Sequence, residues 1–476
     1  MAKPLPRSSP QAQQVDPAAL LALLDALEGN PEIEMHSLMV VCHGHVVAEG
    51  WWAPYTPERR QLLYSLSKSF TSTAAAFAQA EGLLGLDDPL VAHFPELDTE
   101  VVDPRSRSIT LRHVASMASG HTRDTVDEAF SRDPEEPVRG FLLTPPDREP
   151  GSVFAYNQPC TYSLASVVQR NAGMPLTEYL RPRLFDPLGI EDVGWHAWPP
   201  GRELGFTGLH ARTEDVAKLG QLYLQRGRWG NEQLVSEEWV AAATSRQVDN
   251  PGEHDPDWRQ GYGFQFWMAR HGFRGDGAFG QLCVVLPEHD TVVATTARTE
   301  QLQAVLDALW TELLPGLGRA TEDPGAEAEL GRRLQALRLP ACPGKAAPPE
   351  WGPWLSDAFP VAHGMPASSH SALASIEVSR YDGGFVLELS EPDNALTVAV
   401  GPNGWTVSEP RDRHGGVVPV AASGGWLDGE TLRAAVFFLE TPHRLDLTLS
   451  LAGRTAAAVW PHPPLGGDRL GELHSP

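Results

Sequence analysis

Lysine and cysteine are scarce in this chain of 476 residues, and their scarcity narrows the functional hypotheses. The four cysteines are far apart and form no CxxC pair, so we expect neither a disulfide framework nor a thiol-based metal site. We interpret them as reduced, mostly buried apolar residues. Only four of the 37 basic residues are lysines, so a motif that needs a lysine amine is easy to find. The lysines are Lys3, Lys68, Lys218 and Lys345, and the cysteines are Cys42, Cys160, Cys283 and Cys342.

Basic residues are also fewer than acidic residues. Asp and Glu total 61 against 37 Lys and Arg, and the formal net charge of −24 repels phosphate backbones and anionic lipid headgroups. We therefore expect no nucleic-acid partner. The N-terminal residues hold no basic stretch followed by an apolar run of membrane-crossing length, which predicts a cytoplasmic protein without membrane association. The 42% of hydrophobic residues is typical of a globular protein.

Several catalytic and cofactor motifs are absent. The chain has no GxSxG elbow, no HExxH, no P-loop and no Cys/His pair at zinc spacing, so we expect no metal and no organic cofactor. Residues 275–280 match GxGxxG, but a strand-like run follows them where a dinucleotide site needs a helix. We interpret His43, His45, His113 and His121 as surface or packing residues.

The first 315 residues show strand-like segments at both ends and a helical middle. Residues 36–52 predict a β-hairpin, and residues 281–297 predict a second one that turns at residues 288–290. A further strand is predicted at residues 261–268. Helix signals run from residue 65 to about residue 80, and they recur at residues 213–225 and 236–244.

The composition changes after residue 315. Residues 316–366 are rich in Pro, Gly, Ala and charge and predict a linker that could contain one helix at residues 326–337. Beyond the linker, alternating segments separated by turn signals predict a small all-β domain. The predicted division is thus a catalytic domain over residues 15–315, a linker over residues 316–366 and a β domain over residues 367–476.

Ser65-Leu66-Ser67-Lys68 is the one Ser-x-x-Lys sequence in the chain. At positions i and i+3 of a helix the serine and lysine side chains share a face, and a serine in the first turn lies among free backbone N–H groups. A serine hydroxyl becomes a good nucleophile when a base takes its proton, and a lysine is such a base when burial lowers its pKa. The alternative is a capping serine followed by an exposed lysine.

Three runs of the sequence resemble one protein family. LYSLSKSFTSTAAAFAQAEGLLGLDDPLVAHFPE, ITLRHVASMASGH (Ile109 to His121) and GSVFAYN (Gly151 to Asn157) resemble the serine β-lactamase and penicillin-binding-protein superfamily over about residues 35–310. The sharper resemblance is to family VIII carboxylesterases and class C β-lactamase-related hydrolases. It implies an α/β (α+β) domain, with a mainly antiparallel sheet and a helical subdomain, in which Ser-x-x-Lys, Tyr-x-Asn and Lys/His-x-Gly motifs meet in one cleft.

Tyr156-Asn157-Gln158 stands where the resemblance implies the Tyr-x-Asn motif. Tyr156 would relay protons as a phenolate or as a hydrogen-bond bridge, because the lysine cation lowers the cost of the phenolate. The third position is Gln158 in place of Asn, with Asn157 in the middle, and we expect both amides to contact substrate. The alternative for Tyr156 is a half-buried loop tyrosine.

Asp276-Gly277-Ala278-Phe279 is the candidate for the third motif. Gly277 and Ala278 would let the strand backbone approach the substrate, and the backbone N–H groups of Phe279 and Ser65 would form an oxyanion hole. Asp276 stands where relatives have Lys or His, so the cation that holds a substrate carboxylate is missing. Either Arg274 or Arg298 could replace it.

These observations predict a serine hydrolase that acts through an acyl-enzyme on a small neutral ester or amide, with Ser65, Lys68 and Tyr156 as catalytic residues. The alternatives are a β-lactamase or D-amino-acid-specific peptidase, and a catalytically silent binding protein of the same fold. The aromatic residues Trp51, Trp52 and Tyr55 either belong to a core or line the acyl pocket. The sequence leaves open whether the protein forms a homo-oligomer.

Overall fold

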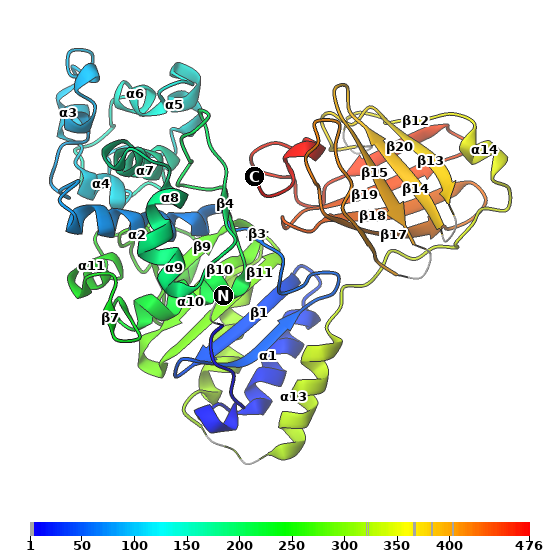
Figure 1. The fold of residues 1–476 in the computed structure, drawn as a ribbon, viewed down its shortest axis with the longest axis horizontal. Coiled ribbons are helices and arrows are strands. Elements are labelled where there is room, and N and C mark those ends of the chain that lie inside the picture. The colour runs from blue at the N-terminus through cyan, green and yellow to red at the C-terminus, as the bar shows by residue number, and fades with distance from the viewer. Residues whose placement is uncertain (1–3, 320, 322, 365–367, 382–383, 402–403) are drawn as a thin grey trace. The chain divides into compact units, whose positions relative to one another are not determined.

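The computed structural model describes residues 4–319, 321, 323–364, 368–381, 384–401 and 404–476. The chain forms two compact units (Figure 1). Unit 1 contains the N-terminal residues up to Gly50 and Leu62–Gln335, and unit 2 contains Trp51–Gln61 and Ala336–Ser475. The chain therefore passes through unit 2 just before it reaches Ser65.

These limits differ from the division expected from the sequence. Most of the expected linker, residues 316–366, belongs to one unit or the other, although residues 320, 322, 365 and 366 lie outside the described part. Helix α13 (Pro324–Ala336) ends unit 1, close to the helix predicted at residues 326–337. Residues 51–61 belong to unit 2, where the Tyr55 ring meets Phe437 at 5.9 Å.

A six-stranded sheet forms the centre of unit 1, in the order β2-β1-β11-β10-β9-β8. Its strands are β1 (Glu34–Cys42), β2 (His45–Trp51), β8 (Trp267–Met268), β9 (Phe273–Gly277), β10 (Gln281–Leu286) and β11 (Thr291–Arg298). Antiparallel pairing of β1 with β11, in which Val40 lies opposite Val293, joins the two predicted hairpins. The predicted sheet made from both ends of the domain is confirmed, but the strand predicted at residues 261–268 is reduced to β8.

Helices occupy the segment between the two hairpins (Figure 1). They are α2 (Ser67–Ala80), α3 (Pro104–Ser108), α4 (Leu111–Ala115), α5 (Val126–Arg132), α6 (Pro137–Leu142), α7 (Gln158–Ala172), α8 (Leu176–Leu180), α9 (Asp186–Leu188), α10 (Thr213–Leu224) and α11 (Glu237–Ala243). Helix α10 packs on β10 and β11, and α1 (Pro17–Gly29) and α12 (Leu302–Ala308) flank this group in the sequence. Within the described ranges, every helix is too short or too polar to cross a membrane.

Helix α2 is buried along almost its whole length although half of its residues are polar. Its hydroxyl groups satisfy backbone carbonyls of other segments: Thr71 donates to Gly205 and Ser72 to Phe264, at 2.8 and 2.7 Å. Buried hydroxyls need such partners, because an unpaired polar group in a protein interior is costly. The helix that follows Ser65 is therefore fixed by specific polar contacts as well as by packing.

Unit 2 is built from two antiparallel sheets, β12-β13-β14-β15 and β16-β17-β18-β19-β20. The strands are β12 (Phe359–Pro360), β13 (Ser375–Tyr381), β14 (Gly384–Ser390), β15 (Ala395–Val400), β16 (Thr406–Ser408), β17 (Val420–Trp426), β18 (Thr431–Phe438), β19 (Arg444–Ser450) and β20 (Thr455–Val459). Inward and outward side chains alternate along β14 and β19, as the predicted all-β region requires. The sequence analysis missed β17 and β20, which are rich in Ala and Gly, residues depleted in strands.

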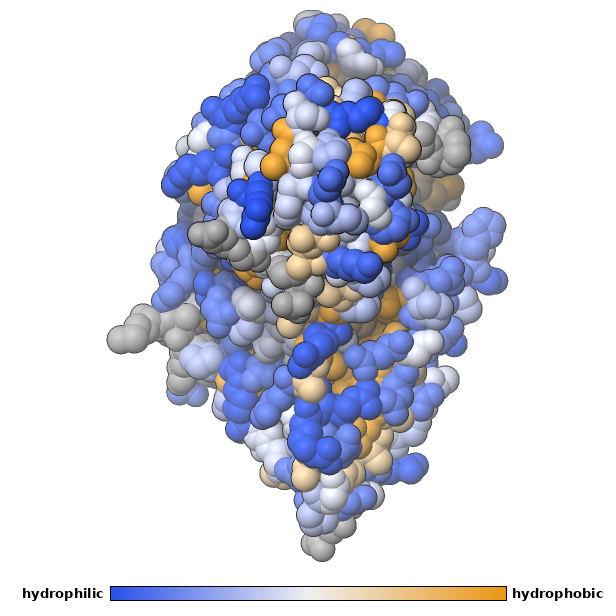
Figure 2. Space-filling view, turned by 90° about the vertical axis from the view of Figure 1, so that its right-hand side faces the viewer, coloured by the Kyte–Doolittle hydropathy of each residue, from blue (hydrophilic) through white to orange (hydrophobic). Residues whose placement is uncertain are grey.

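The inward side chains of unit 2 form one apolar core that includes Trp354, Phe385 and Trp426. On the surface, the face drawn in Figure 2 is mostly hydrophilic, with hydrophobic residues scattered over it. Scattered exposed hydrophobic residues are normal on soluble surfaces. The large aromatic residues of unit 2 thus lie mainly in its interior.

Candidate active site

The structure brings Ser65 and Lys68 together. Ser65 lies in the short helix η2 (Tyr64–Leu66), and Lys68 lies in the first turn of α2. Lys68 Nζ donates to Ser65 Oγ at 2.9 Å. Ser65 is half-buried and Lys68 is fully buried, so the serine can meet a ligand while the lysine is screened from water.

Two further acceptors surround Lys68 Nζ. The side-chain oxygen of Gln158 lies 2.6 Å away and the backbone carbonyl oxygen of Phe206 lies 2.8 Å away. With Ser65 Oγ they match the three N–H donors of an ammonium group. Burial nevertheless lowers the pKa of Lys68 to about 7, against the opposing charges of Asp124 and Asp276. Near neutral pH the amine therefore exists in both protonation states, and the neutral form can take the Ser65 proton.

Tyr156 lies on the other side of the lysine, whose Nζ is 4.8 Å from the centre of the Tyr156 ring. Burial raises the pKa of the Tyr156 hydroxyl well above its ordinary value, although the neighbouring Ser65 hydroxyl opposes this rise. The ring stacks on Trp267 at 5.2 Å. This environment favours a neutral tyrosine and disfavours the phenolate considered from the sequence.

The two amides of the second motif have different surroundings. Gln158, at the start of α7, is half-buried and contacts Lys68. Asn157 is completely buried, and its side-chain oxygen accepts from the backbone N–H and the hydroxyl of Thr125 at 2.9 and 3.1 Å. The structure therefore gives Asn157 a contact within the fold in place of the substrate contact expected from the sequence. Side chains at consecutive positions point in different directions, and only one of the two is directed toward Lys68.

Strand β9 packs directly on the turn that carries Ser65. A Cβ atom at Gly277 would lie 2.1 Å from the backbone oxygen of Leu63, and one at Gly275 would lie 2.3 Å from Leu66 Cδ1. Both glycines are thus required by the close approach of the strand to the turn that carries Ser65. Gly277 was expected from the sequence to make room for substrate, whereas the structure fills that space with protein. Ala278 is partly exposed.

Two residues near Ser65 adopt the left-handed backbone conformation that favours glycine. Tyr64 has a φ of 48° and Phe279 has a φ of 66°, and their rings meet edge to face at 5.3 Å. Such conformations cost energy and recur at functional sites. They fix the backbone immediately before Ser65 and shortly after β9. The oxyanion role of the Ser65 and Phe279 N–H groups stays a prediction.

Asp276 is paired with Arg274 on the same strand, Nε to Oδ2 at 3.0 Å. The Arg274 side chain is fully buried, lies 4.2 Å above the Trp258 ring and donates to the backbone oxygen of Asp257. Burial raises the pKa of Asp276, and the Arg274 charge opposes that effect. Arg274 therefore supplies a cation at the third motif, but one already engaged by a carboxylate. The other candidate, Arg298, forms a two-point ion pair with Glu34.

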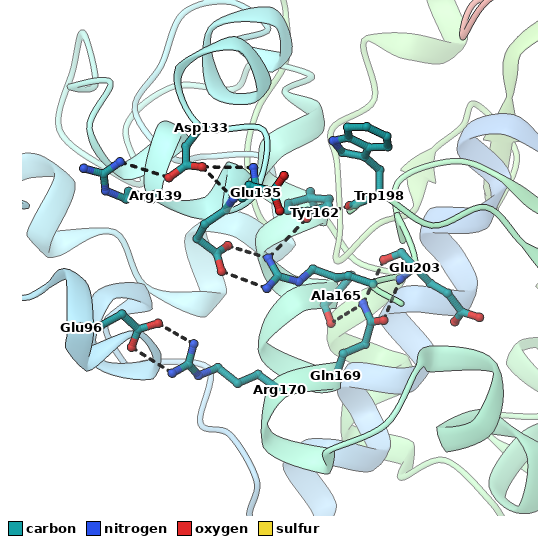
Figure 3. Close-up of polar contacts among 12 residues, drawn as sticks. Glu96, Asp133, Glu135, Arg139, Tyr162, Ala165, Gln169, Arg170, Trp198 and Glu203 are labelled. Atoms are coloured by element: carbon teal, nitrogen blue, oxygen red, sulfur yellow. Dashed lines mark hydrogen bonds and ion pairs between the residues drawn. The ribbon is translucent and has the colours of Figure 1, made fainter. Parts of the chain in front are cut away.

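The Phe206 carbonyl contact was not anticipated, because a backbone group leaves no side-chain signal in a sequence. Its segment is held against α7 by polar contacts drawn in Figure 3: the Gln169 amide exchanges two 2.9 Å hydrogen bonds with the backbone of Glu203, and the Tyr162 hydroxyl donates to the Trp198 carbonyl. Gly205 has a φ of 70°, and a Cβ there would lie 2.3 Å from Ala165. Gly205 is the one feature of the local sequence that indicates this close contact with α7.

Asp124 was also missed, whereas two residues of the aromatic cluster before Ser65 are buried, in line with the core alternative. Asp124 belongs to no motif, yet its side chain contacts Gln158. Trp52 and Tyr55 are buried in unit 2, where the Tyr55 ring meets Phe437 at 5.9 Å. Within the described residues, no three His, Cys, Asp or Glu side chains are grouped so that they could hold a metal.

Residues 23–314 match the protein family described as Beta-lactamase, which is more than half of the chain. The chain belongs to this family and is a β-lactamase-related serine hydrolase. It is 26% identical over 308 residues to the 6-aminohexanoate-dimer hydrolase of Paenarthrobacter ureafaciens, covering 58% of this chain and 78% of that protein.

Two esterases are also similar. The lovastatin esterase of Penicillium rubens is 30% identical over 176 residues, which cover 32% of this chain and 42% of the esterase. Esterase EstB of Burkholderia gladioli is 26% identical over 220 residues, which cover 40% and 56%. The chain thus spans about half the length of these two esterases.

Solved structures share the fold. EstCE1, a hydrolase with promiscuous acyltransferase activity, gives a TM-score of 0.52 at 18% identity and covers 63% of this chain and 99% of its own. SurE gives a TM-score of 0.51 at 19% identity and covers 86% of this chain and 94% of its own. These likenesses support the expected combination of an antiparallel sheet with helices.

Proposed function

We propose that this protein hydrolyses small neutral esters or amides through an acyl-enzyme on Ser65, with Lys68 as the base and Tyr156 as a hydrogen-bonding bridge. The observation that carries the proposal is the 2.9 Å contact between Lys68 Nζ and Ser65 Oγ, made by a lysine whose pKa burial lowers to about 7. A serine beside a base of this kind is an activated nucleophile.

In the acylation step, the neutral Lys68 amine accepts the proton of Ser65, and Ser65 Oγ attacks the substrate carbonyl carbon. The N–H groups of Ser65 and Phe279 stabilise the oxyanion of the tetrahedral intermediate. When that intermediate collapses, the bond to the leaving group breaks, and the Lys68 ammonium returns its proton to the departing alcohol or amine, with Tyr156 bridging the transfer.

Deacylation repeats the sequence with water as the nucleophile. Lys68 accepts a proton from the water, whose oxygen attacks the ester carbon of the acyl-enzyme. Collapse of the second intermediate breaks the bond to Ser65 Oγ, which takes the proton back and releases the carboxylic acid. Gln158 stabilises the ammonium form of Lys68 during both steps through the 2.6 Å contact.

Neutral substrates are favoured because the cation at the third motif is already neutralised. Arg274 is fully buried and bonded to Asp276, so a substrate carboxylate would have to displace that carboxylate. The names of two relatives describe esterases, which supports an ester substrate. Residues Asp276, Gly277 and Ala278 are therefore proposed to shape this end of the site without binding a carboxylate.

Covalent labelling tests the nucleophile. A fluorophosphonate should modify the wild-type protein and leave Ser65→Ala unmodified, with Ser67→Ala as the matched control that still labels. Ser67 is fully buried, and its Oγ accepts from the backbone N–H of Leu209 at 3.0 Å, so the reagent cannot reach it. A well-folded wild-type protein without a Ser65-dependent adduct would show a silent binding protein of the same fold.

Substrate class is tested by comparing rates on p-nitrophenyl butyrate and on a chromogenic cephalosporin. We expect the ester to be cleaved with the larger kcat/KM. Efficient cephalosporin turnover without ester cleavage would replace the esterase or amidase proposal by a β-lactamase or D-amino-acid-specific peptidase.

A further inference from the structure

We propose that Asp124 is a positioning residue for Lys68: it anchors the backbone of Gln158, whose side-chain oxygen meets the lysine, and its negative charge opposes loss of the lysine proton. This inference rests on the proposed function, since it concerns the base of that reaction. It adds to the site a residue that lies in none of the three motifs.

Asp124 forms part of a two-way connection between two loops. Its Oδ1 accepts the backbone N–H of Gln158 at 3.0 Å and that of Val126 at 3.2 Å. In the opposite direction, the Asn157 side chain accepts from the backbone N–H and the hydroxyl of Thr125. Residues 124–125 and 157–158 therefore hold each other by side-chain to backbone bonds. The connection fixes the position of the first residue of α7.

The residue that Asp124 anchors is the one whose side chain meets the lysine. The Gln158 backbone N–H donates to Asp124 Oδ1 at 3.0 Å, and its side-chain oxygen lies 2.6 Å from Lys68 Nζ. Without Asp124, the start of α7 loses one of its anchors, and the Gln158 side chain is less firmly placed against the lysine.

Asp124 is one of several polar groups near the lysine. Asp124, Asp276 and Cys160 favour its charged form, and Asp124 has the largest effect of the three. The charge of Asp276 is partly cancelled by the Arg274 guanidinium at 3.0 Å. Tyr156 stays neutral because burial raises its pKa. Asp124, which is only half-buried, is therefore the carboxylate whose removal most changes the balance between the two forms of Lys68.

The test is the pH dependence of Ser65-dependent ester hydrolysis and fluorophosphonate labelling, from pH 5.5 to 9, in the full-length protein. In Asp124→Asn we expect the midpoint of the acidic limb to move to lower pH by about half a unit or more, because the neutral lysine forms more easily. The plateau rate should fall by about fivefold or more, because Gln158 loses the backbone anchor that places it against Lys68.

Asp127→Asn is the matched control. Asp127 is exposed in the first turn of α5, so this variant removes the same charge three residues away. Its midpoint and plateau should equal those of the wild type. Asp124→Glu keeps the charge on a longer stem and should keep the midpoint while lowering the plateau.

An Asp124→Asn protein with the midpoint and plateau of Asp127→Asn would overturn the inference. If Asp124→Asn does not fold, as judged by circular dichroism and thermal unfolding, Asp124→Glu decides: an unchanged plateau would overturn the positioning role. The proposed function fails in a different way, since wild-type protein would then show no Ser65-dependent labelling at any pH.

Discussion

Helix α2, which carries Lys68, and the core of unit 2 bury different kinds of side chain. Helix α2 buries serines, threonines and one lysine, each supplied with polar partners from other segments. The core of unit 2 is formed mainly by apolar side chains and contains several aromatic residues. The difference suggests that the polar interior around Ser65 serves chemistry and that the apolar interior of unit 2 serves stability. Substitutions around Ser65 should therefore change mainly the activity, and substitutions in the core of unit 2 should change mainly the stability.

The largest expected effect is on chemistry. Lys68→Met keeps most of the side-chain volume and removes the amine, so ester hydrolysis should fall by about 10²–10⁴-fold because the base is lost. Steady-state kinetics with p-nitrophenyl butyrate measures this. Lys218→Met, which changes another buried lysine of unit 1, is the matched control. Equal losses in both variants would show a general effect of burying methionine rather than loss of a base.

The next effect is on stability. Trp426 is fully buried in unit 2, where its ring lies 4.7 Å from Phe385 and 5.0 Å from Trp351. Trp426→Ala should lower the free energy of unfolding of unit 2 by about 3–5 kcal/mol, because it leaves a cavity. Denaturant titration measures the loss, with the exposed neighbour Leu427→Ala as control. A fall in kcat per folded molecule, at unchanged stability, would contradict the separation.

A smaller effect tests the contact between β9 and the Ser65 turn. Gly277→Ala places a methyl group 2.1 Å from the Leu63 carbonyl oxygen, so strand and turn must move apart. Because small displacements of reacting groups are costly, hydrolysis should fall by about 100-fold. Gly429→Ala in unit 2, whose new methyl group would meet only ordinary contacts at 3.6 Å or more, is the control. Wild-type kinetics in Gly277→Ala would mean that the turn tolerates the displacement.

The smallest effect concerns pH. In the proposed mechanism the neutral amine of Lys68 is the reactive form, and burial lowers the pKa of Lys68 to about 7. The kcat/KM for a neutral ester should therefore rise about tenfold per unit below pH 7 and level off above it. The same profile in Trp426→Ala would show that unit 2 leaves the charge balance of the site unchanged. A profile that falls between pH 6 and 8 would contradict Lys68 as the base.

The sequence predicted the parts of the site that depend on local spacing. Ser65 and Lys68 are three residues apart at the start of a helix, so their contact follows from helical geometry. The two hairpins could also be predicted, because alternating β-branched residues flank their turns. Asn157 was assigned to the substrate, since a sequence does not show which of two adjacent amides points toward the lysine.

Other features depended on contacts between distant segments. Asp124, the Phe206 carbonyl and the Arg274–Asp276 pair acquire their roles only when loops from different parts of the chain meet Lys68 or β9. The burial of Trp52 and Tyr55 in unit 2 has the same origin.

Local sequence patterns were enough to place Ser65 and Lys68 next to each other and to predict strands at both ends of a helical segment, because short-range spacing and periodicity encode both. The surroundings of Ser65 and Lys68 depend on the tertiary structure. The burial of Lys68, the placement of Gln158 against it and the pairing of Arg274 with Asp276 involve groups brought together by folding, and electrostatic effects depend on distance in space.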